Sequence, residues 1–314
     1  MVNSRWLSSI ALAGSLGCGL PEAGQDELGD VTGDTSTDGT STSDTSDAST
    51  SDTTSTSDTS TSDASTSDTT SDTSTSDTST SDTTDTTTGN GDACASLGSG
   101  GSTGQAAFAS DMYPNTPGVI LVPQSYDPNQ ATPLMVALHG SGDTAGNFIN
   151  LWAGIAEAEG FIVLVPESIS GGASWNRGAD TPVIGAMIDA VAVEWNVDNC
   201  RIYLTGYSAG AHYGYMLGLA NSTYFAALGI QAGTLQYAEQ AGIWPGMVER
   251  TIAVDIHHGQ ADPYVPFSEA QHARDVLEAA GHTVYFTSHP GGHEIGPGNP
   301  QQMWTNISVH TSLD

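Results

Sequence analysis

The chain has 314 residues and a formal net charge of −31 at pH 7, from 36 acidic residues against 5 basic ones. A surface this acidic repels nucleic acid and anionic membranes, so neither is an expected partner. Residues 94–314 hold most of the apolar sequence and are numerous enough for one domain with a large core.

Residues 1–18 are predicted to be a targeting segment. Arg5 is followed by an apolar stretch from Trp6 to Leu16, which suits the core of a signal peptide and is too short to span a bilayer. The small residues before Cys18 resemble a bacterial lipoprotein signal, in which the cysteine becomes the lipidated N-terminus. Ser15 stands where such signals usually carry leucine, so ordinary cleavage and secretion remain the alternative. Either way the protein is expected to be exported. It is predicted to be an outer-membrane or cell-surface lipoprotein whose lipid is its one contact with the membrane, or alternatively a secreted protein.

Residues 19–93 are predicted to be a disordered linker. From residue 32 to residue 88 nearly every position is Ser, Thr or Asp, in loose repeats with almost nothing apolar to bury. Calcium binding by the regularly spaced aspartates is the weaker alternative, because such sites need glycine turns and fixed ligand geometry. We expect a solvated tether, and the sequence leaves open whether its hydroxyl groups carry sugars.

Two cysteines remain once Cys18 is set aside. In an exported protein Cys94 and Cys200 are candidates for a disulfide, with two free thiols as the alternative. No metal site is predicted, since no Cys-x-x-Cys spacing occurs.

Strands and helices alternate through residues 94–314. Several predicted strands are continuous apolar runs, as expected of parallel strands buried on both faces. The predicted strands are Gly118–Val122, Leu134–Leu138, Phe161–Val165, Ile202–Thr205, Ala226–Ile230, Thr251–His257 and Thr283–Thr287. The predicted helices are Ala145–Glu159, Thr181–Trp195, Ser208–Ala220, Phe267–Ala280 and Pro300–Val309. This order indicates an α/β fold with a doubly wound, mostly parallel sheet and helices on both faces, whose active site lies beyond the carboxyl ends of the strands.

The pentapeptide Gly206-Tyr207-Ser208-Ala209-Gly210 lies between a predicted strand and a predicted helix. The pattern G-x-S-x-G in this context is typical of a nucleophile elbow, a sharp turn that holds a strained serine at the edge of a sheet. Glycines two residues before and after the serine leave room for the neighbouring strand and helix.

Two later loops supply a carboxylate and an imidazole. Asp262 follows the predicted strand Thr251–His257, and His293 follows the predicted strand Thr283–Thr287. The chain order serine, aspartate, histidine is the order found in α/β-hydrolases.

The segment from about 114 to 310 resembles the α/β-hydrolases, and within them the carboxylesterase and poly(3-hydroxybutyrate) depolymerase-like esterases. The matching motifs run in register along the chain and are Leu138-His139-Gly140-Ser141-Gly142-Asp143, Gly206-Tyr207-Ser208-Ala209-Gly210, His258-Gly259-Gln260-Ala261-Asp262 and Gly292-His293-Glu294-Ile295. The resemblance implies Ser208 as nucleophile, His293 as base and Asp262 as the acid that orients it. It also implies an oxyanion hole made by the backbone N–H groups of Ala209 and Ser141, and no cofactor.

Other residues compete for these roles. Asp255 is a rival to Asp262, but it lies inside an apolar strand. His289 and His282 are rivals to His293, which the flanking glycines favour. His212, one helical turn past Ser208, either packs in the core or lines the floor of the site, and core packing is the favoured interpretation.

The substrate pocket is less clearly encoded. Trp175 lies in a glycine-rich loop and is predicted either to offer a stacking surface to substrate or to anchor the loop to the core. Tyr207 is a second candidate for substrate contact, and the segment between Gly233 and Arg250 is a candidate for a short cap over the pocket.

Together these patterns predict an exported serine esterase acting on small-molecule or polymeric esters through an acyl-enzyme. A serine peptidase on the same fold and a non-catalytic surface-binding module are the alternatives, and the sequence does not indicate an oligomeric state.

Overall fold

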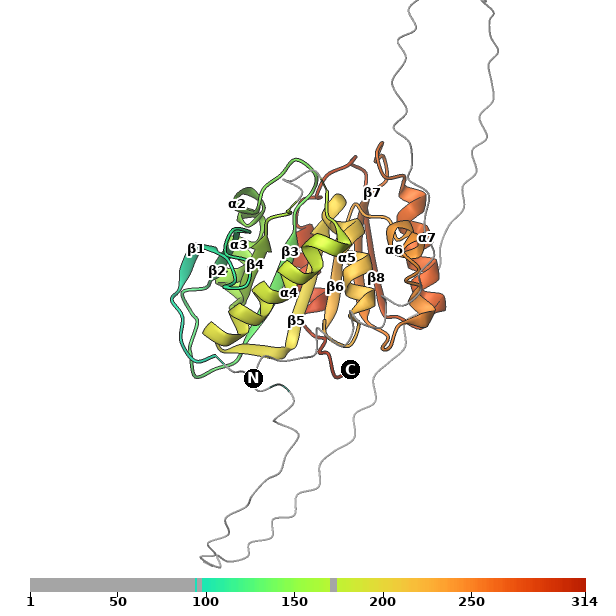
Figure 1. Cartoon of the computed structure of the whole chain (residues 1–314). Coiled ribbons are helices and arrows are strands. Elements are labelled where there is room, and N and C mark those ends of the chain that lie inside the picture. Colours follow the sequence, from blue (N-terminus) through green and yellow to red (C-terminus); the bar gives the residue numbers. More distant parts are fainter. Residues whose placement is uncertain (1–93, 95–97, 170–173) are drawn as a thin grey trace, which may run out of the picture. The chain divides into compact units, whose positions relative to one another are not determined.

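The computed structural model describes residue 94 and residues 98–169 and 174–314 (Figure 1). The predicted targeting segment 1–18 with its candidate lipidation site Cys18, and the predicted linker 19–93, lie outside the described residues.

One eight-stranded sheet organises the described part of the chain, in the order β1-β2-β4-β3-β5-β6-β7-β8. The strands are β1 (Gly104–Phe108), β2 (Gly118–Val122), β3 (Thr132–Leu138), β4 (Ile162–Pro166), β5 (Val197–Tyr207), β6 (Ala227–Gln231), β7 (Ala253–Gly259) and β8 (Val284–His289). β2 pairs antiparallel with both β1 and β4, and the pairs from β4 through β8 are parallel. This confirms the predicted mostly parallel sheet.

Helices follow most of the strands and cover both faces of the sheet. They are α2 (Ala145–Phe148), α3 (Asn150–Glu159), α4 (Arg177–Glu194), α5 (Ala209–Ala220), α6 (Gln236–Gln240), α7 (Phe267–Ala279) and α8 (Asn299–Ile307), with a short 3₁₀ turn η2 (Pro245–Met247). Figure 1 views the face that α4 and α5 cover, and α8 lies behind the sheet. The fold is therefore doubly wound, as predicted.

Side chains that alternate along each strand fill two separate cores. On β3, Leu134 and Val136 face the core formed with α4, α5 and α7, while Met135 and Ala137 face the core formed with α2, α3 and α8. Burial on both faces explains why these strands read as unbroken apolar runs. The two cores fix the sheet from both sides and hold its carboxyl edge as a rigid base for the loops that follow each strand.

Cys94 and Cys200 form a disulfide bond that closes a loop with a sequence separation of 106. Cys200 lies near the start of β5, so the bond attaches the beginning of the described domain to the strand that leads to Ser208. A cross-link of this span restricts the unfolded chain strongly.

Removing this disulfide is therefore expected to lower the free energy of unfolding by about 2–4 kcal/mol. Urea unfolding of the full-length chain with and without reductant measures the difference. The double variant Cys94→Ser, Cys200→Ser serves as the control, because reductant has no bond to break in it. Equal stability of the wild-type chain under both conditions would contradict the prediction.

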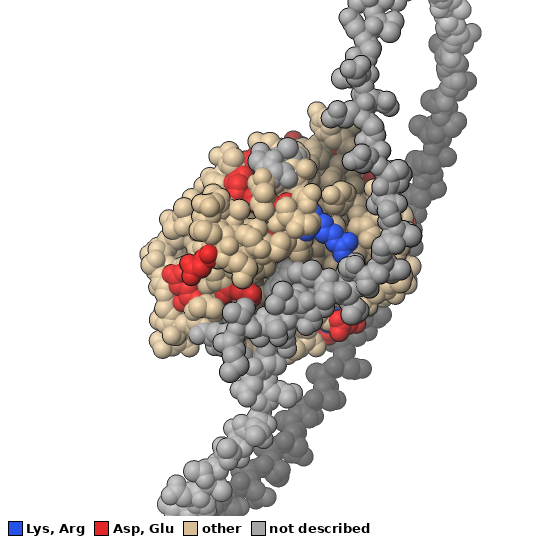
Figure 2. Space-filling model, viewed as in Figure 1, with Lys and Arg blue, Asp and Glu red and all other residues tan. Residues whose placement is uncertain are grey.

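The described surface carries few basic groups. In Figure 2 acidic side chains occupy several separate places on the face shown, and basic side chains gather in one. No helix among the described residues combines the length and the apolar character needed to span a bilayer.

Candidate active site

Ser208 lies at the turn between β5 and α5, at the carboxyl edge of the sheet. Its backbone has φ 52° and ψ −118°, and Ser208 is one of two non-glycine residues with positive φ in the described chain. A side chain in this region is strained, and such strain persists only where the surrounding structure holds it. The hydrogen bond from the Ser208 N–H to the Gln231 carbonyl, at 3.0 Å, ties the turn to the end of β6.

The glycines of the motif are required by close backbone approach. A Cβ on Gly206 would lie 2.3 Å from the carbonyl oxygen of Gly210, and one on Gly210 would lie 2.1 Å from the carbonyl oxygen of Leu138. Both distances are shorter than any van der Waals contact. The first turn of α5 therefore packs directly on the end of β3 because no side chain separates them.

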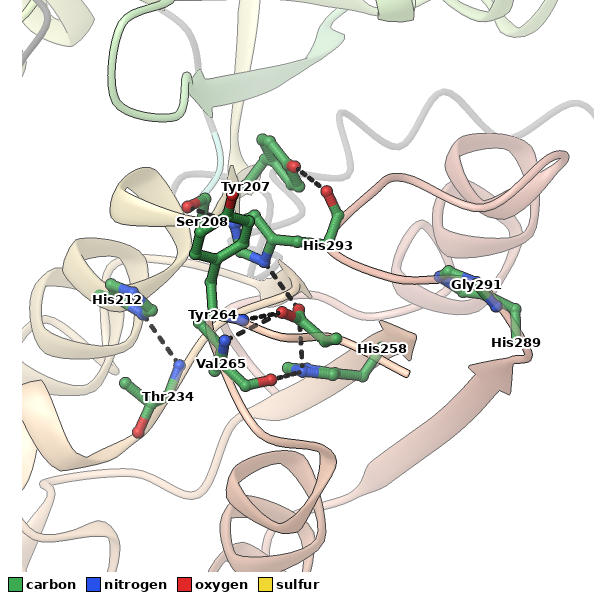
Figure 3. A network of polar contacts seen from close by, with 11 residues as sticks. Tyr207, Ser208, His212, Thr234, His258, Tyr264, Val265, His289, Gly291 and His293 are labelled. Carbon is green, nitrogen blue, oxygen red and sulfur yellow. Dashed lines mark hydrogen bonds and ion pairs between the residues drawn. The ribbon is translucent and has the colours of Figure 1, made fainter. Parts of the chain in front are cut away.

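The His293 ring joins Ser208 to Asp262. His293 Nε2 lies 2.8 Å from Ser208 Oγ, and His293 Nδ1 lies 2.7 Å from Asp262 Oδ2. The three residues come from the β5–α5 turn, the loop after β7 and the loop after β8. Figure 3 shows Ser208 and His293 side by side. Each ring nitrogen has one partner, so the imidazole is fixed in both position and orientation.

Asp262 is buried and held as a carboxylate. Its Oδ1 accepts hydrogen bonds from the N–H groups of Tyr264 and Val265, each at 2.9 Å. Burial acts to raise the pKa of Asp262, but these backbone donors and the His293 ring outweigh it and hold the pKa below its usual value. Asp262 therefore stays charged at neutral pH and favours the tautomer of His293 with its proton on Nδ1.

Three further residues contact the triad of Ser208, His293 and Asp262. His258 lies 3.4 Å from Asp262 Oδ2 and contacts the Val265 carbonyl at 2.8 Å, so it supports the loop that carries the carboxylate. The hydroxyl of Tyr207 donates to the His293 carbonyl at 2.8 Å, which gives this predicted substrate-binding residue a structural contact to the loop after β8. Tyr264, 79% exposed, packs its ring against the His293 ring in a T-shaped arrangement (Figure 3).

Neither Tyr264 nor His258 was assigned a role of its own from the sequence. The one signal for both is position, since His258 comes four residues before Asp262 and Tyr264 two residues after it.

The rival residues lie elsewhere. Asp255 is fully buried in β7, 3.0 Å from His257 and bonded to the side chain of Asn306. His282 is buried against the backbone of Ile252 and Pro245. His289 bonds through Nδ1 to the N–H of Gly291.

Trp175 packs in the interior. It is 4% exposed, its Nε1 donates to the His139 carbonyl at 3.0 Å, and its ring stacks on Tyr213. Of the two alternatives for this residue, the packing favours the anchor of the loop and not the substrate surface. By bonding to the residue after β3, Trp175 supports the backbone beside Ser208.

The loop after β3 lies against the serine turn. A Cβ on Gly140 would lie 3.4 Å from the Ser208 Cβ, so the backbone just before Ser141 touches the elbow. Ala209 is the first residue of α5, where N–H groups have no partner within the helix. The two candidate oxyanion donors therefore belong to segments on either side of Ser208.

Among the described residues, Cys94, Asp198 and Cys200 are the one cluster with the side chains of a metal site. Both sulfur atoms of that cluster are joined in the disulfide.

His212, on α5, is half-buried beside this site. Its Nδ1 accepts a hydrogen bond from the Thr234 N–H at 2.9 Å (Figure 3), so the neutral ring carries its proton on Nε2. Burial lowers the pKa of His212 to about 4, and the nearby His293 and His258 rings act in the same direction. His212 is therefore neutral at pH 7.

In an NMR titration the His212 ring is expected to change charge with a midpoint near pH 4. A histidine in the unfolded chain has a pKa near 6.5. Between pH 6.5 and 4 the unfolded state therefore binds more protons than the folded state, and the free energy of unfolding falls as the pH drops through that window. A His212→Asn variant assigns the signal and should show a smaller fall. A midpoint above pH 6 would contradict this picture.

The chain is similar to known esterases. A sequence model of the phospholipase/carboxylesterase family matches residues 178–311. A probable feruloyl esterase C of Aspergillus terreus is 26% identical over 212 residues, covering 58% of this chain and 78% of the relative. Acetylxylan esterase A of Emericella nidulans is 32% identical over 149 residues, covering 41% of this chain, and the match spans about half of the relative, 48%.

Among solved structures, a CE1 ferulic acid esterase from Anaeromyces mucronatus superposes with a TM-score of 0.53 at 14% identity, over 68% of this chain and 92% of that chain. This likeness shows the fold, and the sequence relatives are esterases. The fold is therefore that of the α/β-hydrolases, and the sequence relatives support a carboxylic ester hydrolase.

Proposed function

We propose that this protein is an exported serine esterase that releases acyl groups from ester-decorated polysaccharides through an acyl-enzyme on Ser208. The observation that carries the proposal is the hydrogen-bonded series from Ser208 Oγ through His293 to Asp262, at 2.8 and 2.7 Å. Hydrogen-bonding distance at both steps is what a serine nucleophile needs to be activated by a general base.

In the first half of the reaction Ser208 Oγ attacks the ester carbonyl carbon while His293 Nε2 takes the hydroxyl proton. Asp262, which bonds to Nδ1, stabilises the imidazolium that forms. The tetrahedral intermediate then collapses, the bond to the leaving alcohol breaks, and His293 returns the proton to the alcohol oxygen. The acyl group is left on Ser208.

In the second half a water molecule attacks the acyl-enzyme. His293 takes a proton from the water and gives it to Ser208 Oγ as the acid leaves. Both tetrahedral intermediates carry negative charge on the former carbonyl oxygen. We assign its stabilisation to the backbone N–H groups of Ala209 and Ser141, whose segments flank Ser208, and one such donor typically contributes about 10²–10³-fold in rate.

The substrate class rests on the relatives. Proteins named feruloyl esterase and acetylxylan esterase match this chain, and the names describe feruloyl esters and acetyl esters of the polysaccharide xylan. The exposed Tyr264 beside His293 offers an aromatic surface at the site, which is compatible with a feruloyl ring.

We also propose that residues 1–18 export the protein, that Cys18 carries a lipid and that residues 19–93 act as a tether for the catalytic domain 94–314. The disulfide between Cys94 and Cys200 supports export, because such bonds persist in oxidising compartments.

A substrate panel tests the proposed function. The full-length chain is assayed with p-nitrophenyl acetate, methyl ferulate, acetylated xylan and the anilide that corresponds to the acetyl ester. We expect turnover of the esters and none of the anilide. Faster cleavage of the anilide would indicate the peptidase alternative, and no turnover of any substrate would indicate a binding module.

A further inference from the structure

An open hollow of about 730 Å³ lies between α6, η2 and α7. Ser208, His293 and Asp262 do not line it. Trp244, directly before η2, lines it with a side chain that is 47% exposed. Gln236 and Gln240 from α6 and Glu269 and His272 from α7 line it as well. Its volume falls within the range of small-molecule sites, and it combines one aromatic surface with several polar groups.

The polar groups of the hollow are held in fixed directions. Glu269 accepts hydrogen bonds from Gln236 Nε2 at 2.8 Å and from Thr234 Oγ1 at 2.7 Å. Glu239, on α6, lies 3.0 Å from His272 Nε2 on α7. Each carboxylate therefore has an anchored orientation, and a carboxylate oxygen has lone pairs left to accept further hydrogen bonds from a ligand.

Thr234 contacts Glu269, which lines the hollow, and His212, which lies beside the catalytic serine. Thr234 bonds to Glu269 with its hydroxyl and to the His212 ring with its backbone N–H. The backbone N–H of His212 bonds to the Ser208 carbonyl at 2.9 Å, one helical turn away at the start of α5. Thr234 and His212 therefore lie between Glu269, which lines the hollow, and the serine turn.

We propose that this hollow is a sugar subsite that binds a neutral polysaccharide backbone, so that an ester on a neighbouring sugar reaches Ser208. The inference rests on the proposed function and names the part of the substrate that Trp244 contacts. A sugar presents an apolar C–H face to an aromatic ring and hydroxyl donors at its edge, which match Trp244 and the anchored carboxylates of Glu239 and Glu269. The same two carboxylates repel an acidic polysaccharide.

Binding to an inactive full-length chain tests the subsite separately from catalysis. In a Ser208→Ala background, calorimetric titration with xylohexaose is expected to show binding, and adding Trp244→Ala is expected to weaken it by roughly tenfold or more. Trp244→Phe keeps an aromatic face and should retain most of the affinity. Val309→Ala removes an exposed apolar side chain that does not line the hollow, and it should leave binding unchanged.

Thermal unfolding of each variant confirms that it folds. Absence of xylohexaose binding at millimolar concentration, or equal affinity with and without Trp244, would overturn the subsite. Preferential binding of an acidic oligogalacturonate or of an amino-sugar oligomer would also overturn it, since the neutral backbone would not be the occupant. Turnover of small esters by the wild-type chain is measured independently, so failure of the subsite and failure of the proposed esterase are distinguishable.

Discussion

Replacing Ser208 with alanine is expected to lower kcat for ester hydrolysis by about 10⁴–10⁶-fold, because the acyl-enzyme has no other oxygen on which to form. His293 and Asp262 would keep their bond to each other, since neither contact depends on the serine side chain. Steady-state rates with p-nitrophenyl acetate measure the loss. Activity within tenfold of the wild-type chain would remove Ser208 from the mechanism.

A glycine at the same position separates catalysis from stability. Ser208 has a φ of 52°, a conformation that glycine adopts without strain and alanine does not. Ser208→Gly is therefore expected to be as inactive as Ser208→Ala but to have a free energy of unfolding higher by about 1 kcal/mol. Urea unfolding of the two variants makes the comparison, and a less stable glycine variant would contradict the strain at the elbow.

Replacing Asp262 with asparagine is expected to lower kcat by about 10⁴-fold, an effect comparable to losing the serine. The amide cannot hold the proton of His293 on Nδ1 or stabilise the imidazolium, although its size is nearly that of the carboxylate. The loss should appear in kcat and kcat/KM together, because the interaction matters most in the transition state. A change confined to KM would instead assign Asp262 to substrate binding.

Asp255→Asn is the matched control for this substitution. Both aspartates are buried and both contact a histidine, but Asp255 contacts His257 and not His293. We expect the control to retain catalysis while it loses stability, because it disturbs a buried pair in β7. Equal losses of kcat in the two variants would mean that Asp262 has no special role in orienting His293.

The sheet and its order of elements were predictable because the buried strands have a clear sequence pattern. β2 has the predicted limits, and the other predicted strands differ at their ends. β1 was missed because its sequence, Gly-Gln-Ala-Ala-Phe, has little apolar pattern and its three central residues are exposed at the sheet edge. Edge strands bury too little surface to leave a signal.

The start of α4 shows how a local hydrogen bond overrides a sequence signal. The prediction placed the start at Thr181, since Pro182 follows it, but the helix begins at Arg177. The Asn176 side chain accepts from the N–H groups of Gly178 and Ala179 and caps the helix one turn earlier. Pro182 is tolerated near the N-terminus, where its missing N–H costs little.

The candidate catalytic residues could be proposed from sequence because each follows a strand whose carboxyl end faces the same edge. The hollow could not, because Trp244, Glu239 and Glu269 come from two helices and a turn that share no motif and meet only in the folded chain. Likewise, the interior position of Trp175 depends on its contacts with His139 and Tyr213, which spacing along the chain does not encode.

Mass spectrometry of the trapped intermediate tests the central claim most directly. The full-length chain is incubated with a slowly hydrolysed ester, quenched in acid and digested, and the acylated residue is identified. We expect one acyl group, attached to Ser208, and a larger yield of it in the Asp262→Asn chain if deacylation slows more than acylation. Turnover accompanied by an acyl group on any other residue, or by none under conditions that trap other serine esterases, would contradict it.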